Sequence, residues 1–171
     1  APELNASGVS VTTDGGGTWQ ALGATYQDRD AYALAADPAN PQIIYVGTMC
    51  SRGLFRSDDG GQTFTHLPAL PSHYTMRLAV APWDSEYVYM TSAFGVHRST
   101  NGGKNWSDLF EGGHFHGLAV APDQTIYVGS SPSEGGAAGG GGREDSGDGF
   151  PVEGAYLYRS DDGGNLSLIH I

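Results

Sequence analysis

The sequence predicts an all-β protein assembled from repeated four-stranded antiparallel sheets. Three observations support this fold class: one octapeptide occurs four times, a second element recurs between its copies, and 27 of the 171 residues are glycine. Glycine-rich turns that join short strands of β-branched and aromatic residues are typical of antiparallel sheets. A repeat of about 40–45 residues with four strands is typical of a β-propeller blade.

The octapeptide predicts a tight turn between the third and fourth strands of each blade. Its copies are TTDGGGTW (Thr12–Trp19), SDDGGQTF (Ser57–Phe64), STNGGKNW (Ser99–Trp106) and SDDGGNLS (Ser160–Ser167). The carboxylate at the third position can accept hydrogen bonds from amides of its own loop, and the paired glycines allow a positive φ. The aromatic residue at the eighth position is expected to fold back between sheets. We therefore assign a structural role to Asp14, Gly16, Trp19, Asp59, Gly61, Phe64, Asn101, Gly103, Trp106, Asp162 and Gly164.

The repeats divide residues 1–165 into a run of about three to four blades. The first and second strands of a blade recur at Leu34–Thr48, Leu78–Thr91 and Leu118–Ser130. The predicted division is a partial blade at 8–22, full blades at about 32–67 and 76–110, and a partial blade at 115–165 with a loop insertion at 131–151. A β-solenoid is the structural alternative, but we find no subperiod of about 20–30 residues to support it.

The ends of the run differ from the repeat. The octapeptide pattern requires Thr and Trp after Asn165, whereas the chain continues with Leu166 and Ser167. We interpret residues 166–171 as a non-native tail. Propellers close with about 4–8 blades, so we expect this run to associate with the remaining blades of its parent chain.

The octapeptide resembles the Asp-box, or bacterial neuraminidase repeat, with the pattern Ser-x-Asp-x-Gly-x-Thr-Trp. Phe64 replaces the tryptophan in the second copy, and Asn101 replaces the aspartate in the third. Proteins with this repeat include sialidases, sortilin-type receptors, xyloglucan-hydrolysing enzymes, a photosystem assembly factor and uncharacterised exported bacterial propellers. The resemblance implies a propeller and an extracytoplasmic location, periplasmic or secreted. It does not determine an activity, because one fold hosts many functions.

Composition excludes several classes of partner. The net charge is −11, with 8 basic and 19 acidic residues, so the chain repels phosphate backbones and no nucleic-acid partner is expected. A photosystem-assembly role would imply a basic patch, which this chain lacks. No apolar run reaches the roughly 18–20 residues that span a bilayer, so no membrane insertion is expected. Cys50 is the single cysteine and we expect it to be buried or idle.

Candidate functional residues lie in the loops that do not repeat from blade to blade. The resemblance implies that loops entering the first strand and loops joining the second strand to the third share one face, opposite the octapeptide turns. The binding-face candidates in these loops are Asp28, Arg29, Asp30, Arg52, His73, Tyr74, Arg77, Glu111, His114 and His116.

Two groups of residues suggest metal ions without defining a site. His114 and His116 would point to the same side of a strand, and Glu111 could add an oxygen ligand, but no further ligands are evident. Asp145 and Asp148 in the glycine-rich insertion do not have EF-hand spacing. We therefore expect a polar rim and a disordered insertion, with no metal and no cofactor.

Catalytic patterns are incomplete. Sialidases use an arginine cluster to hold the substrate carboxylate, and Arg29, Arg52 and Arg77 are the arginines outside the repeat. The arginines that occupy one slot of three successive third strands instead suggest scaffold: Arg56, Arg98 and Arg159. A glycoside hydrolase needs two carboxylates about 5–10 Å apart, for which the candidates are Asp28, Asp30, Glu111 and Glu134.

Two functional hypotheses follow. The first is a non-catalytic propeller that presents a loop-built surface to a glycan or protein partner. The alternative is a fragment of a glycoside hydrolase, sialidase-like or xyloglucanase-like, whose catalytic residues lie partly on missing blades. Two carboxylates converging in a funnel would favour the enzyme, and exposed aromatic and polar groups without such a pair would favour the binding module.

Overall fold

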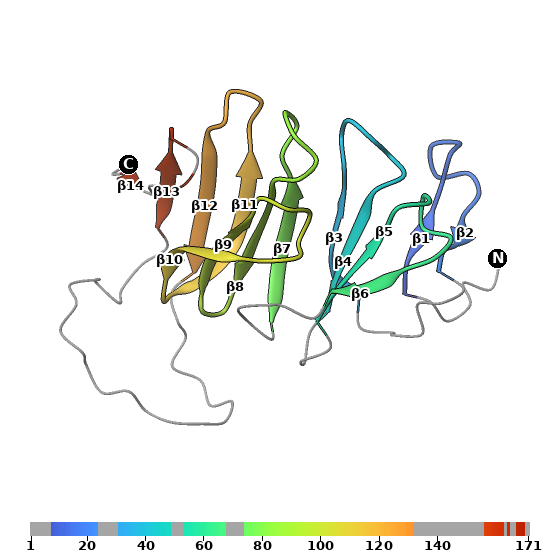
Figure 1. Ribbon diagram of the computed structural model, residues 1–171, viewed down its shortest axis with the longest axis horizontal. Coiled ribbons are helices and arrows are strands. Elements are labelled where there is room, and N and C mark those ends of the chain that lie inside the picture. Colours follow the sequence, from blue (N-terminus) through green and yellow to red (C-terminus); the bar gives the residue numbers. More distant parts are fainter. Residues whose placement is uncertain are drawn as a thin grey trace.

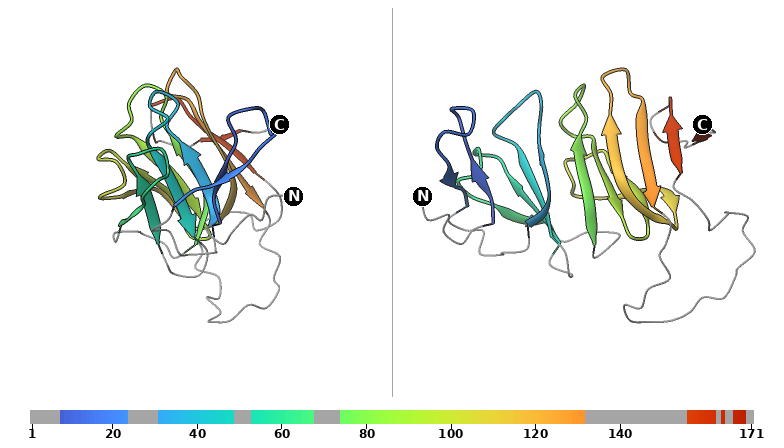
Figure 2. Two further views of the ribbon diagram at one scale, coloured as in Figure 1. Left: turned by 90° about the vertical axis from the view of Figure 1, so that its right-hand side faces the viewer. Right: turned by 180° about the vertical axis from the view of Figure 1, so that it is seen from behind.

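The computed structural model describes residues 8–23, 31–48, 53–67, 74–131, 156–162, 164 and 167–169. Every regular element within these ranges is a β-strand, and the strands form four antiparallel sheets that stand side by side in a row (Figure 1). The view from behind, in which left and right are exchanged, shows the same succession of sheets from the N-terminus to the C-terminus (Figure 2). This arrangement confirms the all-β prediction.

Each sheet is a meander in which neighbouring strands follow one another along the chain. The first sheet contains β1 (Ser10–Val11) and β2 (Gln20–Ala21). The second contains β3 (Ala31–Ala36), β4 (Ile44–Thr48), β5 (Leu54–Ser57) and β6 (Thr65–Leu67). The third contains β7 (Thr75–Val80), β8 (Val88–Ser92), β9 (Gly95–Ser99) and β10 (Ser107–Glu111). The fourth contains β11 (His114–Val120), β12 (Ile126–Ser131), β13 (Leu157–Ser160) and β14 (Ser167–Ile169).

The fourth sheet extends beyond the C-terminal boundary expected from the sequence, because it includes β14. The repeat pattern ended the fourth blade at residue 165, but Ser167–Ile169 pairs antiparallel with β13 and supplies a fourth strand. Strand pairing uses backbone N–H and C=O groups, so a segment that departs from the octapeptide can still cover the edge of a sheet.

The core lies between successive sheets. Residues of both faces of β8 are buried, because Val88 and Met90 pack toward the second sheet while Tyr89 packs toward the fourth. A strand covered on both faces needs apolar residues at both alternating sets of positions, which explains the continuous VYM run. A third cluster joins the first sheet to the second through Val9, Val46 and Phe64.

The meander places two kinds of connection at opposite edges of the row. We call the edge with the octapeptide turns the turn edge. It also carries the connections between the first two strands of each four-stranded sheet. Two backbone hydrogen bonds join these features, from Gly60 to Gln42 at 2.9 Å and from Gly102 to Glu86 at 2.9 Å. The opposite edge, which we call the loop edge, carries the connections β8–β9 and β10–β11 (Figure 1).

Candidate functional site

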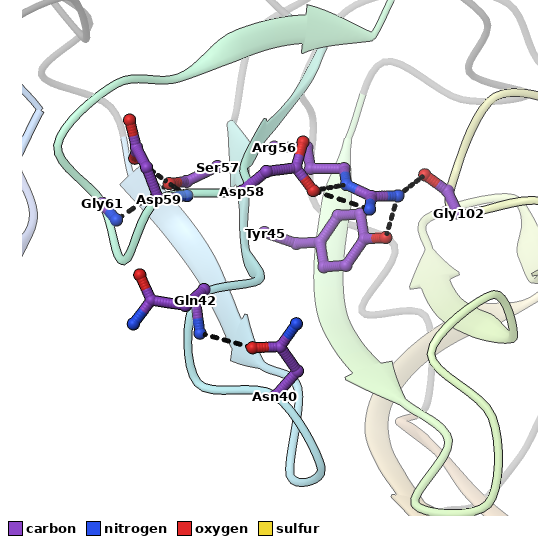
Figure 3. Close-up of polar contacts among 9 residues, drawn as sticks. All are labelled: Asn40, Gln42, Tyr45, Arg56, Ser57, Asp58, Asp59, Gly61 and Gly102. Carbon is purple, nitrogen blue, oxygen red and sulfur yellow. Dashed lines mark hydrogen bonds and ion pairs between the residues drawn. The ribbon is translucent and has the colours of Figure 1, made fainter.

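Asp59 organises the octapeptide turn of the second sheet. Its carboxylate accepts hydrogen bonds from the Ser57 hydroxyl at 2.7 Å, the Thr63 hydroxyl at 2.6 Å and the Thr63 amide at 2.9 Å. The Ser57 oxygen in turn accepts the Gly61 amide at 2.8 Å (Figure 3). These donors, with Thr63 the strongest, favour the ionised carboxylate and lower the pKa of Asp59 to about 2.

The other three turns share part of this pattern of contacts. Asp14 accepts the Thr18 amide at 2.9 Å, and the Thr18 hydrogen bonds hold the pKa of this carboxyl well below its usual range. Asn101 accepts the Asn105 amide at 2.8 Å through its side-chain oxygen. The Ser160 hydroxyl donates to Asp162 at 2.9 Å. These groups are engaged within their own turns, so they hold hairpins rather than face a ligand.

The hydroxyl at the first position of the octapeptide is a feature that the sequence analysis missed. It accepts the amide of the second glycine in every turn, as in Thr12 with Gly16 at 2.9 Å and Ser99 with Gly103 at 2.8 Å. The signal was present in the sequence, because every copy begins with Ser or Thr.

Leucines of one sheet pack against the second glycine of the next turn. A side chain on these glycines would collide with the leucine, because an added Cβ would stand within 3 Å of it. The distance from the added Cβ to the nearest leucine atom is 2.6 Å for Gly61 with Leu22, 2.9 Å for Gly103 with Leu67 and 2.7 Å for Gly164 with Leu109. Gly16, at the end of the row, has no atom of the described residues within 4 Å of the same position.

Arg56 joins the second sheet to the third (Figure 3). Its guanidinium lies over the Tyr45 ring at 5.5 Å from the centroid and donates to the Tyr45 hydroxyl at 3.1 Å. It also donates to the Gly102 carbonyl in the next octapeptide turn at 3.2 Å. Arg159 lies over Tyr127 in the same way, at 5.9 Å from the ring centroid. These repeat arginines therefore belong to the scaffold, as their shared slot indicated.

Trp19 does not lie between sheets, contrary to the expectation for the eighth position. It is 46% exposed, whereas Phe64 is 9% exposed and Trp106 is partly buried against the core between the second and third sheets. Phe64 and Trp106 each pack toward the preceding sheet. The first sheet stands at the end of the row, so among the described residues there is no preceding sheet for Trp19 to contact (Figure 1).

An exposed aromatic pair lies at the loop edge of the third sheet. Tyr74 precedes β7 and Phe94 lies in the short turn between β8 and β9. Their ring centroids are 6.5 Å apart with an interplanar angle of 47°, and 38% of Tyr74 and 59% of Phe94 are exposed. Large apolar side chains exposed together are typical of binding surfaces.

The polar candidates lie on β7 and β10 of the third sheet and on β11 of the fourth. Glu111 ends β10 and the next connection donates a hydrogen bond from the Gly112 amide to the Phe94 carbonyl at 2.8 Å. His114 and His116 are both exposed and flank the buried Phe115, with His116 at a register shift in β11. Arg77 lies within β7 rather than before it, is exposed, and donates to the Met76 carbonyl at 2.7 Å.

The remaining candidates lie outside the described residues. These are Asp28, Arg29, Asp30, Arg52 and His73, together with Cys50, Glu134, Asp145 and Asp148. A pair of nearby carboxylates would distinguish an enzyme from a binding module. Of the four carboxylates named as catalytic candidates, Glu111 is the one that lies within the described residues. No group of three or more His, Cys, Asp or Glu residues capable of holding a metal ion occurs within the described ranges. Those ranges also contain no helix that could cross a membrane.

A hydrogen-bonded chain beneath the Phe94 turn, buried at Ser92 and His97 and exposed at Asp108, was not anticipated from the sequence. The Asp108 carboxylate lies 2.6 Å from His97 Nδ1, and His97 Nε2 lies 3.0 Å from the Ser92 hydroxyl oxygen. His97 is 3% exposed and Ser92 is fully buried. Burial lowers the pKa of His97, and the hydrogen bond that its Nδ1 donates to the Asp108 carboxylate opposes that effect.

This order of residues is that of a hydrolase triad, but Ser92 has a scaffold role. The corresponding residues Thr48 and Ser130 also place a hydroxyl at the end of the second strand. Thr48 donates to the Gly53 carbonyl at 2.9 Å, and Ser130 accepts the Tyr156 amide at 3.1 Å. A nucleophile must reach its substrate, and the Ser92 oxygen is enclosed by the sheet.

Comparisons with known proteins support the architecture. No family model matches the chain. A solved structure of an ancestral GH74 enzyme superposes with a TM-score of 0.64 at 18% identity, covering 82% of this chain and 18% of that one. The structure titled YCF48 bound to D1 peptide gives a TM-score of 0.57 at 17% identity, covering 91% of this chain and 46% of that one. The fold is that of a run of β-propeller blades.

The propeller blades also have a curated relative by sequence. Xyloglucanase Xgh74A of Acetivibrio thermocellus is 27% identical over 134 residues, which cover 60% of this chain. The chain spans 16% of the length of that relative.

Proposed function

We propose that this chain is part of an extracytoplasmic Asp-box propeller that binds a β-glucan, such as a xyloglucan chain, on its loop edge. The observation that carries the proposal is the exposed pair Tyr74–Phe94, whose tilted rings stand 6.5 Å apart at centroid. Pyranose rings carry an apolar C–H face that stacks on aromatic side chains, while polar groups nearby bind the hydroxyls. The relationship to a xyloglucanase supports the choice of sugar.

The polar surroundings of the pair suit a neutral glycan. Glu111, His114 and His116 are exposed, and the short connection at Gly112 is hydrogen-bonded to the Phe94 backbone. Carboxylate and imidazole groups accept and donate hydrogen bonds to sugar hydroxyls without requiring a charged ligand. The net charge of −11 disfavours an anionic polysaccharide.

Calorimetry with xyloglucan oligosaccharides tests the proposal. We expect binding by the full chain and a loss of about tenfold or more in affinity for both Phe94→Ala and Tyr74→Ala, because each removes a stacking surface. Trp19→Ala is the matched control, since Trp19 is an exposed aromatic residue at the turn edge. Binding that survives both loop-edge changes, or no binding by the unchanged chain, would contradict the proposal.

Glycoside hydrolysis is the second candidate, favoured by the position of Glu111 beside the aromatic pair and by the xyloglucanase relative. A carboxylate acts as general acid or nucleophile only with a second one nearby. Release of reducing sugars from xyloglucan that disappears in Glu111→Gln, while oligosaccharide binding persists, would support catalysis.

A further inference from the structure

The chain Asp108–His97–Ser92, in which His97 and Ser92 are buried and Asp108 is exposed, occurs in only one of the three four-stranded sheets. The residues at the position of His97 are Phe55 in the second sheet and Tyr158 in the fourth, as the strand registers show. Asp108 corresponds to His66, which packs on Phe55 with ring centroids 5.1 Å apart. The blade fold is thus built with aromatic residues at this site, and the fold does not require the His–Asp pair.

The chain of hydrogen bonds ends on the turn that carries the aromatic pair. Ser92 Oγ accepts the Phe94 amide at 3.0 Å and lies 3.4 Å from the Gly95 carbonyl oxygen. The hydroxyl has one proton to donate, either to His97 or to the carbonyl of Gly95. The protonation of His97 therefore decides which of these two bonds the Ser92 hydroxyl makes.

We propose that His97 and Asp108 are positioning residues that hold the Phe94 turn in its ligand-binding geometry and make that geometry dependent on pH. The proposal rests on the proposed glycan function. With His97 neutral, Nδ1 donates to Asp108 and Nε2 accepts the Ser92 hydroxyl proton. When His97 is protonated, Nε2 donates to Ser92 Oγ and the hydroxyl proton turns to the more distant Gly95 carbonyl. Ser92 Oγ then accepts from both His97 and the Phe94 amide, and this second donor weakens its hydrogen bond with the Phe94 amide.

Few charged or titratable groups among the described residues can influence the protonation of His97. Asp108 on β10 is the charged group that acts on His97 among the described residues. β8 presents Met90 and Ser92, and the core shared with the second sheet is apolar. His66 of the second sheet lies on the opposite side of that sheet, with Phe55. Burial lowers the pKa of His97 from the ordinary histidine value, so His97 is neutral near neutral pH and is protonated only in more acidic solution.

Two measurements on the full chain test the proposal. The first is hydrogen exchange of the Phe94 amide without ligand, which reads the turn directly. His97→Phe places the residue of the second sheet at this site, and we expect exchange at Phe94 to become about tenfold faster. The matched control is Phe55→Leu, which changes the same position of the second sheet and should leave Phe94 exchange unaltered.

The second measurement is the affinity for a xyloglucan oligosaccharide between pH 5 and 8. The unchanged protein should bind with constant affinity near neutral pH and more weakly as the pH falls through the lowered pKa of His97. His97→Phe should weaken binding by about fivefold and give a flat profile. His97→Gln, whose amide can bond to both neighbours, should restore most of the affinity and keep the profile flat. Asp108→Asn removes the charge that favours protonation and should move the change to lower pH.

The outcomes separate the two proposals. If no oligosaccharide binds but His97→Phe accelerates exchange at Phe94, the glycan function fails and the positioning role stands. If the oligosaccharide binds and His97→Phe alters neither Phe94 exchange nor the affinity and its pH profile, the positioning role is overturned and the glycan function stands.

Discussion

The interface between the second and third sheets differs from the outer side of the first sheet, although the same octapeptide turn is present in both places. In the interface, Gly103 packs on Leu67 and the Gly102 carbonyl accepts a hydrogen bond from Arg56. At the end of the row, no other part of the chain that the structure describes comes within 4 Å of the Cβ position of Gly16. The hydrogen bonds inside the two turns are nevertheless alike. The turn thus forms from local contacts, and its packing role arises only when a sheet lies beside it.

The largest effect should come from a methyl group at the second glycine. Gly103→Ala introduces a Cβ at 2.9 Å from Leu67 on a residue with φ of +84°. We expect it to lower the free energy of unfolding by about 3 kcal/mol through strain and overpacking. Gly16→Ala, with φ of +101° and open space around it, should cost about 1 kcal/mol from the backbone alone. Chemical denaturation measures both free energies of unfolding. Equal losses would show that the contact with Leu67 adds nothing to the cost of the substitution.

A smaller effect should follow from loss of the arginine that crosses the interface. Arg56→Met removes the bond to the Gly102 carbonyl and the contact with the Tyr45 ring. We expect a loss of about 1–2 kcal/mol in the free energy of unfolding. Arg159→Met is the control, because Arg159 pairs with the exposed Asp161 and, among the described residues, makes no hydrogen bond or ion pair to another sheet. The comparison fails if both substitutions lower the thermal midpoint equally.

The smallest expected effect is on the hydrogen bonds to Asp59 within its own turn, and it is measured as a change in stability at low pH. The pKa of Asp59 is lowered from 3.8 to about 2, so the unfolded chain binds its proton first as the pH falls. The stability that ionised Asp59 contributes is complete above about pH 4 and is lost as the pH falls through 2. Asp59→Asn copies the third turn, where Asn101 accepts the same amide bond. The thermal midpoint of this variant should be slightly lower at pH 7 and should fall less than that of the unchanged protein on acidification. The same acid dependence in both proteins would contradict a stabilising role for ionised Asp59.

Much of the fold could be predicted because a propeller repeat is a local pattern. Strand alternation, glycine pairs and hydroxyl or carboxylate groups at fixed offsets act within about ten residues, so they are visible in the sequence. The hydroxyl at the first position was visible too and was overlooked. The burial of Trp19 was predicted wrongly, because the eighth residue contacts a neighbouring sheet and its environment depends on the row.

The candidate site was less predictable. Tyr74, Glu111, His114 and His116 were named from their loops, and the structure places them at the loop edge of the third sheet or directly beside it. Phe94 was not chosen, because one aromatic residue in a short turn gives no pattern. His97 and Asp108 are eleven residues apart on adjacent strands, and their contact depends on strand register.

The sequence by itself determined that this chain forms repeated four-stranded sheets joined by octapeptide turns, since those features follow from short-range hydrogen bonding and side-chain alternation. Only the tertiary structure decided which copies of the turn are packed, which aromatic residues are exposed, and that a histidine, a carboxylate and a hydroxyl meet beneath Phe94. These outcomes depend on distances between residues that the chain brings together by pairing strands and stacking sheets, and no local pattern encodes them.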